Sequence, residues 1–225
     1  RGKKMFGLFK KKKKAESGMK LRGFPGDLST VKCLVMAAEK EVKLETELLD
    51  TQAGAQDEAE YRSLSPFGKV PYLQEGDAIA IGAEASLAYL DTRGKGFLNP
   101  KKAQNFGLMN YWGQVAETIT APVESLINAS AFGSAEDGDA VERIETALDA
   151  LDAALTGNKK LIVGEYSYAD AHWTAVAHFI DLAGKQSLID SRVNVKAWHD
   201  KVKERPSYAS LPSLDDIKQK QLKTA

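Results

Sequence analysis

Residues 65–73 read Ser-Pro-Phe-Gly-Lys-Val-Pro-Tyr-Leu, and this stretch decides the fold. Pro71 follows a β-branched valine and stands directly before a short apolar segment. Because proline cannot donate to a β-ladder, it belongs at the first residue of a strand, at an edge or at a bulge. An X–Pro bond is also the common place for a cis peptide, which forms a tight turn. The stretch therefore predicts a tight turn followed by a strand.

The composition is that of an ordinary globular chain. Its 225 residues are 43% hydrophobic and 28% charged, enough to bury one large core or two small ones. The longest uninterrupted apolar run, residues 33–38, is far shorter than the ~20 residues that cross a bilayer. The single cysteine excludes an internal disulfide.

A net charge of zero hides a strong asymmetry along the chain. Residues 1–20 carry a charge of +8, and the remainder of the chain carries −8. Such a basic arm could lie on an anionic membrane, bind an acidic protein or nucleic acid, or remain a solvated tail. Because the chain begins with arginine, we expect that a targeting peptide has been removed. The expected interaction residues of the arm are Phe6, Phe9, Lys10, Lys11, Lys12, Lys13 and Lys14.

Residues 19–93 alternate between strand-like and helix-like patterns. Asp27 or Ser29 can cap the first helix, and Leu44, Thr46 and Leu48 alternate with charged residues as in a half-buried strand. The predicted strands cover residues 19–24, 44–48, 70–73 and 78–81, and the predicted helices cover residues 30–40 and 84–92. A further helix is expected in the polar segment before Pro71. This order predicts an α/β unit of thioredoxin type.

Everything after a glycine-rich linker at residues 94–100 has a helical pattern. Residues 102–132 form a long amphipathic stretch, and apolar residues recur at helical spacing over 139–155. Ser167 and Asp170 stand three apart, as in a capping box at the start of a helix. The expected organisation is a basic arm (1–18), an α/β domain (19–93), a linker (94–100) and an all-helical domain (101–225).

Two motifs resemble those of glutathione-transferase-like proteins. Pro66–Pro71 is similar to their Pro-x-Gly-x-Val-Pro loop, in which a cis-proline lies beside the glutathione site. Val163-Gly164 with Ser167–Asp170 is similar to the Val-Gly…Ser/Thr-x-Ala-Asp motif of their helical domain. The resemblance covers roughly residues 19–215. It implies a cis Val70–Pro71 bond and the transferase fold, an α/β thioredoxin-like domain followed by an all-α helical bundle domain.

The resemblance also implies a hydroxyl group that stabilises the thiolate of glutathione near the end of the first strand. The family spacing puts Asp27 at the serine position and Phe24 at the tyrosine position, and neither has a hydroxyl group. A carboxylate at that position would disfavour a neighbouring thiolate. Ser29 is the remaining candidate, although serine at this place favours a helix cap.

The γ-glutamyl end of glutathione needs a Glu/Gln-Ser pair after the fourth strand, according to the same resemblance. The family spacing puts Gly82 and Ala83 there, and neither side chain can hold the ligand. Glu84 could substitute only if the register shifts by two residues. Val70, Pro71 and Glu84 are thus the predicted glutathione contacts.

The remaining reactive residue types are expected to be structural. Cys33 lies about a turn into the first helix on an apolar face, which favours a core residue over a reactive thiol. His172 and His178 are six residues apart and face different sides of a helix. No metal site is expected from the histidines.

Residues 24–38 also look like a stretch of the gamma subunit of translation elongation factor one, which reads Tyr-Pro-x-Asn…Lys-x-Leu-x-x-Ala-Ala. That subunit uses the transferase fold mainly as a scaffold. The first hypothesis is therefore a protein that has lost transferase chemistry, binds no cofactor, and serves as a docking subunit of a larger, membrane-peripheral assembly.

Two alternatives remain open. The first is an active or glutathione-binding glutathione S-transferase, in which Ser29 activates the thiol. The second is an adaptor that binds a membrane surface or nucleic acid through the basic arm. The expected partners are the protein subunits of a complex or a second copy of the chain, in the cytoplasm or, after removal of a transit peptide, in a plastid or mitochondrion.

Overall fold

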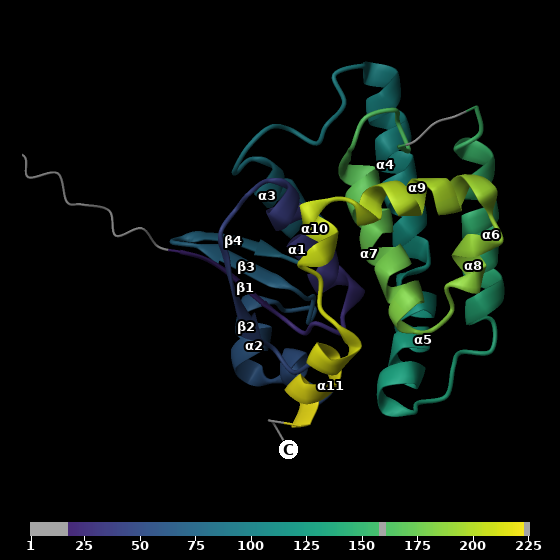
Figure 1. The fold of residues 1–225 in the computed structure, drawn as a ribbon. Coiled ribbons are helices and arrows are strands. Elements are labelled where there is room, and N and C mark those ends of the chain that lie inside the picture. Colours follow the sequence, from purple (N-terminus) through teal and green to yellow (C-terminus); the bar gives the residue numbers. More distant parts are fainter. Residues whose placement is uncertain (1–17, 158–160, 223–225) are drawn as a thin grey trace, which may run out of the picture.

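The structure is a computed structural model, which describes residues 18–157 and 161–222 (Figure 1). The predicted interaction residues of the basic arm, Phe6, Phe9 and Lys10–Lys14, lie outside the described residues.

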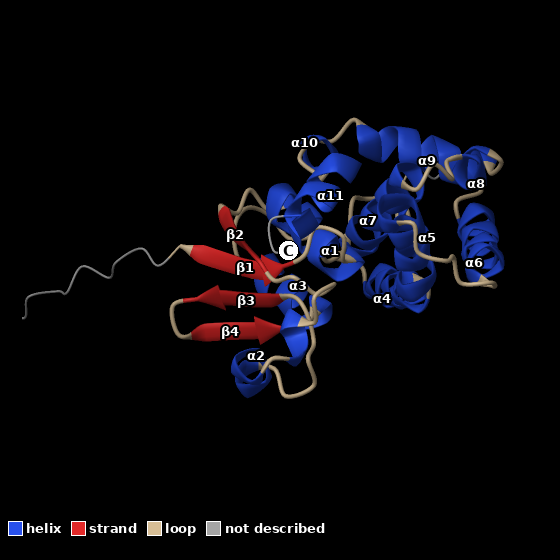
Figure 2. Cartoon of the chain, turned by 90° about the horizontal axis from the view of Figure 1, so that it is seen from below, coloured by secondary structure: helices blue, strands red, loops and turns tan. Residues whose placement is uncertain are grey.

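The first half of the chain is a four-stranded mixed sheet with helices. The sheet has the order β2-β1-β3-β4, in which β1 and β2 are parallel and the other neighbours are antiparallel (Figure 2). This arrangement confirms the predicted thioredoxin-like class. The elements are β1 (Met19–Gly23), α1 (Leu28–Glu39), β2 (Leu44–Leu48), a 3₁₀ turn (Ala55–Asp57), α2 (Ala59–Leu64), β3 (Tyr72–Glu75), β4 (Ala78–Ile81) and α3 (Ala83–Asp91).

The strand register brings three connections to one edge of the sheet. Tyr72 at the start of β3 pairs with Arg22 near the end of β1 and with Ile81 at the end of β4. The β1–α1 loop, the loop before β3 and the β4–α3 turn therefore meet at that edge. The Gly82 N–H donates to the Pro71 carbonyl at 2.8 Å, and the Val70–Pro71 bond is cis as predicted.

The second half of the chain is helical. Its elements are α4 (Ala103–Thr118), α5 (Thr120–Phe132), α6 (Ala140–Ala154), α7 (Tyr168–Leu182), α8 (Ser187–Asp190), α9 (Val193–Lys203), α10 (Pro206–Ala209) and α11 (Leu214–Leu222). The prediction of one helical stretch over 102–132 needs a correction, because the helix breaks at Ile119. Pro122 has no N–H for the Thr118 carbonyl, which accepts instead from the Arg143 side chain at 3.2 Å.

Helix α1 is buried on both of its sides. Leu28, Val31 and Val35 belong to the large core of the helical half, whereas Cys33 and Met36 belong to the core beneath the sheet. Figure 2 shows α1 between the strands and the helical half. Cys33 is fully buried, as predicted for a core residue. Because α1 packs against both halves, its position determines how they meet.

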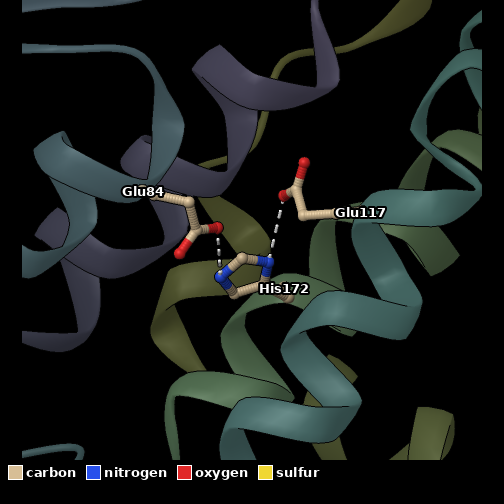
Figure 3. A group of neighbouring side chains, drawn as sticks. All are labelled: Glu84, Glu117 and His172. Carbon is tan, nitrogen blue, oxygen red and sulfur yellow. Dashed lines mark ion pairs between the residues drawn. The ribbon is translucent and has the colours of Figure 1, made fainter.

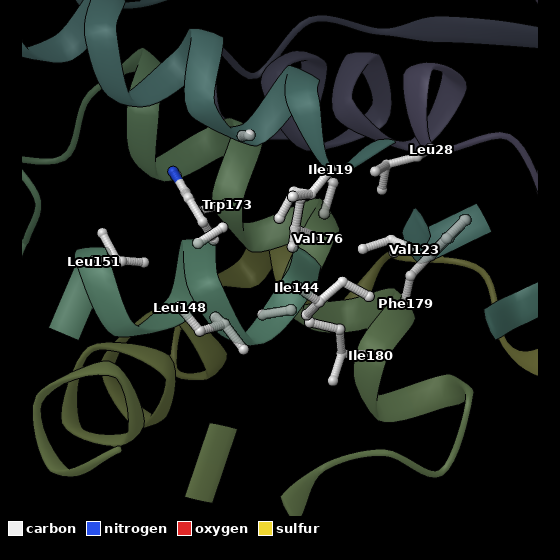
Figure 4. Packing of buried hydrophobic residues seen from close by; sticks show 14 of the residues in the cluster. Leu28, Ile119, Val123, Ile144, Leu148, Leu151, Trp173, Val176, Phe179 and Ile180 are labelled. Atoms are coloured by element: carbon white, nitrogen blue, oxygen red, sulfur yellow. The ribbon is translucent and has the colours of Figure 1, made fainter. Parts of the chain in front are cut away.

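Helix α7 runs through the middle of the helical core. Trp173, Val176, Phe179 and Ile180 point from it into a cluster that α5 and α6 complete (Figure 4). Every residue from 169 to 180 is buried. A helix that is buried all round must satisfy its polar groups internally.

The predicted capping box at the start of α7 is present. Asp170 accepts from the Ser167 N–H at 3.0 Å, the Trp198 Nε1–H at 2.9 Å and the Ile162 N–H at 3.1 Å. Burial raises the pKa of the Asp170 carboxyl, and these donors oppose that shift. The Asp170 carboxylate thus connects the start of α7 to α9 and to the segment that precedes α7.

We predict that Asp170→Asn lowers the free energy of unfolding by about 1–3 kcal/mol. The amide replaces one carboxylate oxygen with an NH₂ group, which cannot accept, so at least one of the N–H or O–H donors around Asp170 loses its acceptor. Chemical denaturation followed by circular dichroism measures the change. The matched control is Asp139→Asn, since Asp139 is exposed and pairs with Arg143 only at 3.8 Å. Equal losses in the two variants would contradict the role of Asp170.

Candidate functional site

Ser29 lies in the first turn of α1, after Asp27 at the N-cap position. Of the two predicted caps, Asp27 holds the N-cap position without a side-chain cap hydrogen bond, and Ser29 does not cap the helix, because the helix begins one residue before it. The Ser29 hydroxyl has no hydrogen-bond partner among the described residues, and neither do the Ser29 and Thr30 N–H groups. Free amides and the positive end of the helix dipole favour an anion at this position.

Two carboxyl groups lie beside this helix end. Asp27 accepts from the Thr51 hydroxyl at 2.9 Å, and Glu124 of α5 accepts from the Leu28 N–H at 2.8 Å. Burial, and then the charge of Glu124, raise the pKa of Asp27 to about 7. Burial also raises the pKa of Glu124. A fixed negative charge was expected at Asp27, but near neutral pH this carboxyl is only partly ionised.

The loop before β3 presents a free backbone edge. The Lys69 carbonyl accepts from the Tyr61 hydroxyl at 2.7 Å and from the Ser65 hydroxyl at 3.1 Å, which hold the loop in place. Within residues 18–157 and 161–222, the Val70 N–H and C=O have no partner. An extended peptide could therefore pair with Val70 next to Pro71 as an added strand would.

The β4–α3 turn completes the same edge. Gly82 has φ 83° and ψ 168°, a conformation that is nearly restricted to glycine. The first backbone hydrogen bond of α3 is donated by the Ser86 N–H to the Gly82 carbonyl, at 3.2 Å. The Ala83 and Glu84 N–H groups precede it and have no acceptor in the described part of the chain. This helix end can therefore accept a carboxylate through backbone groups.

The Glu84 side chain turns toward the helical half. Its Oε2 accepts from the Tyr168 hydroxyl at 3.3 Å, and its Oε1 lies 3.7 Å from His172 Nε2 (Figure 3). The sequence prediction for the histidines did not include Glu84 or Glu117 as neighbours of His172. Residues 84, 117 and 172 come from α3, α4 and α7, and no spacing in the sequence indicates that they meet.

A buried ion pair lies behind His172. Lys32 of α1 is fully buried, and its ammonium group donates to Glu117 and, at 3.0 Å, to the Thr120 hydroxyl. His172 Nδ1 lies 3.4 Å from the same Glu117 oxygen. Burial alone would raise the pKa of Glu117, but His172 and the Lys32 charge hold it at about 2. Burial lowers the pKa of His172.

A cleft of about 680 Å³ opens in front of Glu84 and Tyr168. Phe97, Phe106 and Met109 contribute apolar surface to its lining. This edge of the sheet thus combines the N-terminus of α1 with the unpaired Ser29 hydroxyl, the free backbone groups of Val70, and the N-terminus of α3. The cleft adjoins it.

The fold is that of the glutathione S-transferases. The model of the glutathione S-transferase N-terminal domain matches residues 17–92, and that of the C-terminal domain matches residues 129–210. The chain belongs to this family.

Similar proteins cover most of the chain. It is 32% identical to glutathione S-transferase F14 of Arabidopsis thaliana over 213 residues, which is 86% of this chain and 82% of that protein. It is 29% identical to glutathione S-transferase F10 of the same plant over 194 residues, 80% of this chain and 90% of that protein. Glutathione transferase F2 of Populus trichocarpa has the same fold, with a TM-score of 0.75 and 21% identity over 90% of this chain and 99% of that one.

The first functional hypothesis is corrected by these relatives. A docking subunit without transferase chemistry was predicted, but the relatives over most of the chain are glutathione S-transferases. The hypothesis relied on the missing side chains at Asp27, Gly82 and Ala83, and it neglected the backbone groups at the same positions. None of the relatives named above is a gamma subunit of an elongation factor.

We predict that Asp27→Asn stabilises the chain at pH 8, stabilises it less at pH 5, and has little effect below pH 3.8. The pKa of Asp27 is raised from its ordinary 3.8 to about 7 in the folded state, so folding favours the protonated form. Its contribution to stability is complete below pH 3.8 and is lost as the pH rises through 7. A pKa difference of one corresponds to about 1.4 kcal/mol. At pH 8, the substitution should therefore raise the free energy of unfolding by roughly 2–4 kcal/mol.

Chemical denaturation of both proteins across this pH range measures the difference. Asp77→Asn, in the exposed turn between β3 and β4, is the control. A gain from Asp27→Asn that does not depend on pH would show that ionisation of Asp27 is not its cause.

Proposed function

We propose that this chain is an active glutathione S-transferase, in which the Ser29 hydroxyl and the N-terminus of α1 stabilise the glutathione thiolate. The thiolate sulfur forms a bond to an electrophilic carbon, and the leaving group departs with its electron pair. The thiol proton passes to solvent before the attack. The relatives at 28–32% identity, all named glutathione S-transferases, support this assignment.

The unpaired Ser29 hydroxyl is the observation that carries the proposal. It lies next to two free N–H groups at the positive end of α1, where an anion is favoured. A hydroxyl donor and a helix dipole lower the pKa of a neighbouring thiol. The residue also lies in the element that follows β1, at the sheet edge where the cis Val70–Pro71 bond is found.

The other parts of glutathione fit backbone groups at the same edge. The cysteinyl unit is proposed to pair with the free N–H and C=O of Val70, next to Pro71. The γ-glutamyl carboxylate is proposed to accept from the Ala83 and Glu84 N–H groups at the start of α3. The Glu84 carboxylate, predicted to hold the γ-glutamyl ammonium, contacts Tyr168 in the free protein, so its role toward glutathione remains a prediction.

Substitution of Ser29 tests the proposal. Ser29→Ala should lower kcat for conjugation of glutathione to a dinitrophenyl halide by about 10- to 100-fold, the effect of one hydrogen bond to a charged group. The KM for glutathione should change little, because the backbone contacts remain. Steady-state kinetics measure both parameters, and Ser63→Ala, at an exposed position of α2, is the matched control. Undiminished kcat in Ser29→Ala would remove Ser29 from this role.

The predictions about partners and location remain predictions. A homodimer, an anionic membrane, nucleic acid and the cytoplasm or an organelle were expected from the sequence, and those that depend on the arm concern residues outside the described ranges. Among the described helices, none combines the length and the apolar character that a membrane crossing requires.

A further inference from the structure

Two carboxylates lie beside the ring of His172, one near each of its nitrogens (Figure 3). Glu117 Oε1 lies 3.4 Å from Nδ1, and Glu84 Oε1 lies 3.7 Å from Nε2. The side chain is 1% exposed, and neither ring nitrogen makes a hydrogen bond. A buried polar group without a partner is costly, and the position of this ring therefore needs an explanation.

The surroundings of Glu117 determine which ring nitrogen carries the proton. The Glu117 carboxylate is fixed by Lys32 and lies on the Nδ1 side. The neutral ring therefore places its single proton on Nδ1, where the negative charge attracts it.

With the proton on Nδ1, the Nε2 nitrogen and Glu84 Oε1 are two acceptors only 3.7 Å apart. Among the described residues, no donor bonds to Nε2. The Tyr168 hydroxyl cannot supply one, because it donates to the other Glu84 oxygen at 3.3 Å. Imidazole nitrogen and carboxylate oxygen are both ligand types that zinc accepts.

The spacing suits a metal ion. At metal–ligand distances of about 2.1 Å, the 3.7 Å between Nε2 and Oε1 corresponds to a ligand–metal–ligand angle of about 124°, near the tetrahedral range. Glu84 is 64% exposed, so a small rotation of its side chain can bring this ligand–metal–ligand angle to the tetrahedral value. Within the described residues, Glu84, Glu117 and His172 form the group of potential ligands that lies close enough to hold a metal, with atoms within 4.8 Å of one another.

We propose that this chain binds a divalent transition-metal ion of the zinc type between His172 Nε2 and the Glu84 carboxylate. Glu117 supports the site from outside, because a carboxylate behind the distal nitrogen orients a metal-binding histidine and fixes its tautomer. Water from the cleft that Glu84 lines fills the remaining coordination positions.

The ligand types select the class of metal. Imidazole nitrogen with one carboxylate suits zinc, cobalt or nickel, whereas magnesium and calcium prefer sites made of oxygen. Glu117 is not a direct ligand, since it lies at the other ring nitrogen and its oxygen is held by Lys32. The proposed site does not depend on transferase activity.

Titration of the full-length, tag-free chain with zinc in the absence of glutathione tests the proposal, because glutathione itself binds zinc. Calorimetry should show one saturable site. Cobalt, used as a spectroscopic probe, should give visible absorption bands that zinc abolishes. Glu84→Gln and His172→Gln should each weaken zinc binding at least tenfold, and Glu142→Gln, an exposed acid on α6, should leave it unchanged.

Absence of saturable zinc binding to the wild-type chain would overturn the proposal, and so would unchanged binding in Glu84→Gln. The Glu84 variant is decisive because an exposed side chain can be replaced without loss of the fold. Circular dichroism of His172→Gln shows whether that buried variant retains its helices.

Discussion

The buried ion pair between Lys32 and Glu117 is the interaction on which the rest of the structure depends. Lys32 is fully buried on α1, and an ammonium group in that position is tolerated only beside a counter-ion. Glu117 supplies this charge from α4, and Thr120 at the start of α5 adds a hydrogen bond. These two contacts of Lys32 join the α/β half to the helical half at one point.

This ion pair also sets the chemistry on both of its sides. Lys32 lies one turn after Ser29, so that fixing Lys32 fixes the end of α1 that carries the hydroxyl. On the other side, the same Glu117 oxygen lies 3.4 Å from His172 Nδ1. The positive end of α1 meets the carboxyls of Asp27 and Glu124, and burial raises the pKa of both groups.

Much of the fold could be predicted from local patterns. The turn at Pro71, the capping box at Asp170 and the buried Cys33 depend on neighbours in the sequence or on one helix face, and the structure confirms all three. The break at Ile119 was missed although Pro122 indicates it, because apolar periodicity continues across that residue.

The site was harder to predict, for two physical reasons. A motif that is defined by side chains counts Gly82 and Ala83 as lost ligand contacts. The N–H groups at the start of a helix are present whatever side chains these positions carry. The sequence therefore suggested a lost function where backbone groups remain. The cluster of Glu84, Glu117 and His172 depends on how three distant helices pack, which no local pattern reports.

The pKa of the glutathione thiol in the bound state tests the central claim most directly. Titration of the ultraviolet absorbance of the thiolate, with the protein in excess over glutathione, gives this value. The account predicts a pKa at least one below the ordinary thiol value of about 8.5 in the wild-type chain, and a smaller shift in Ser29→Ala. A bound thiol that titrates like free glutathione, or saturating glutathione that does not bind, would contradict it.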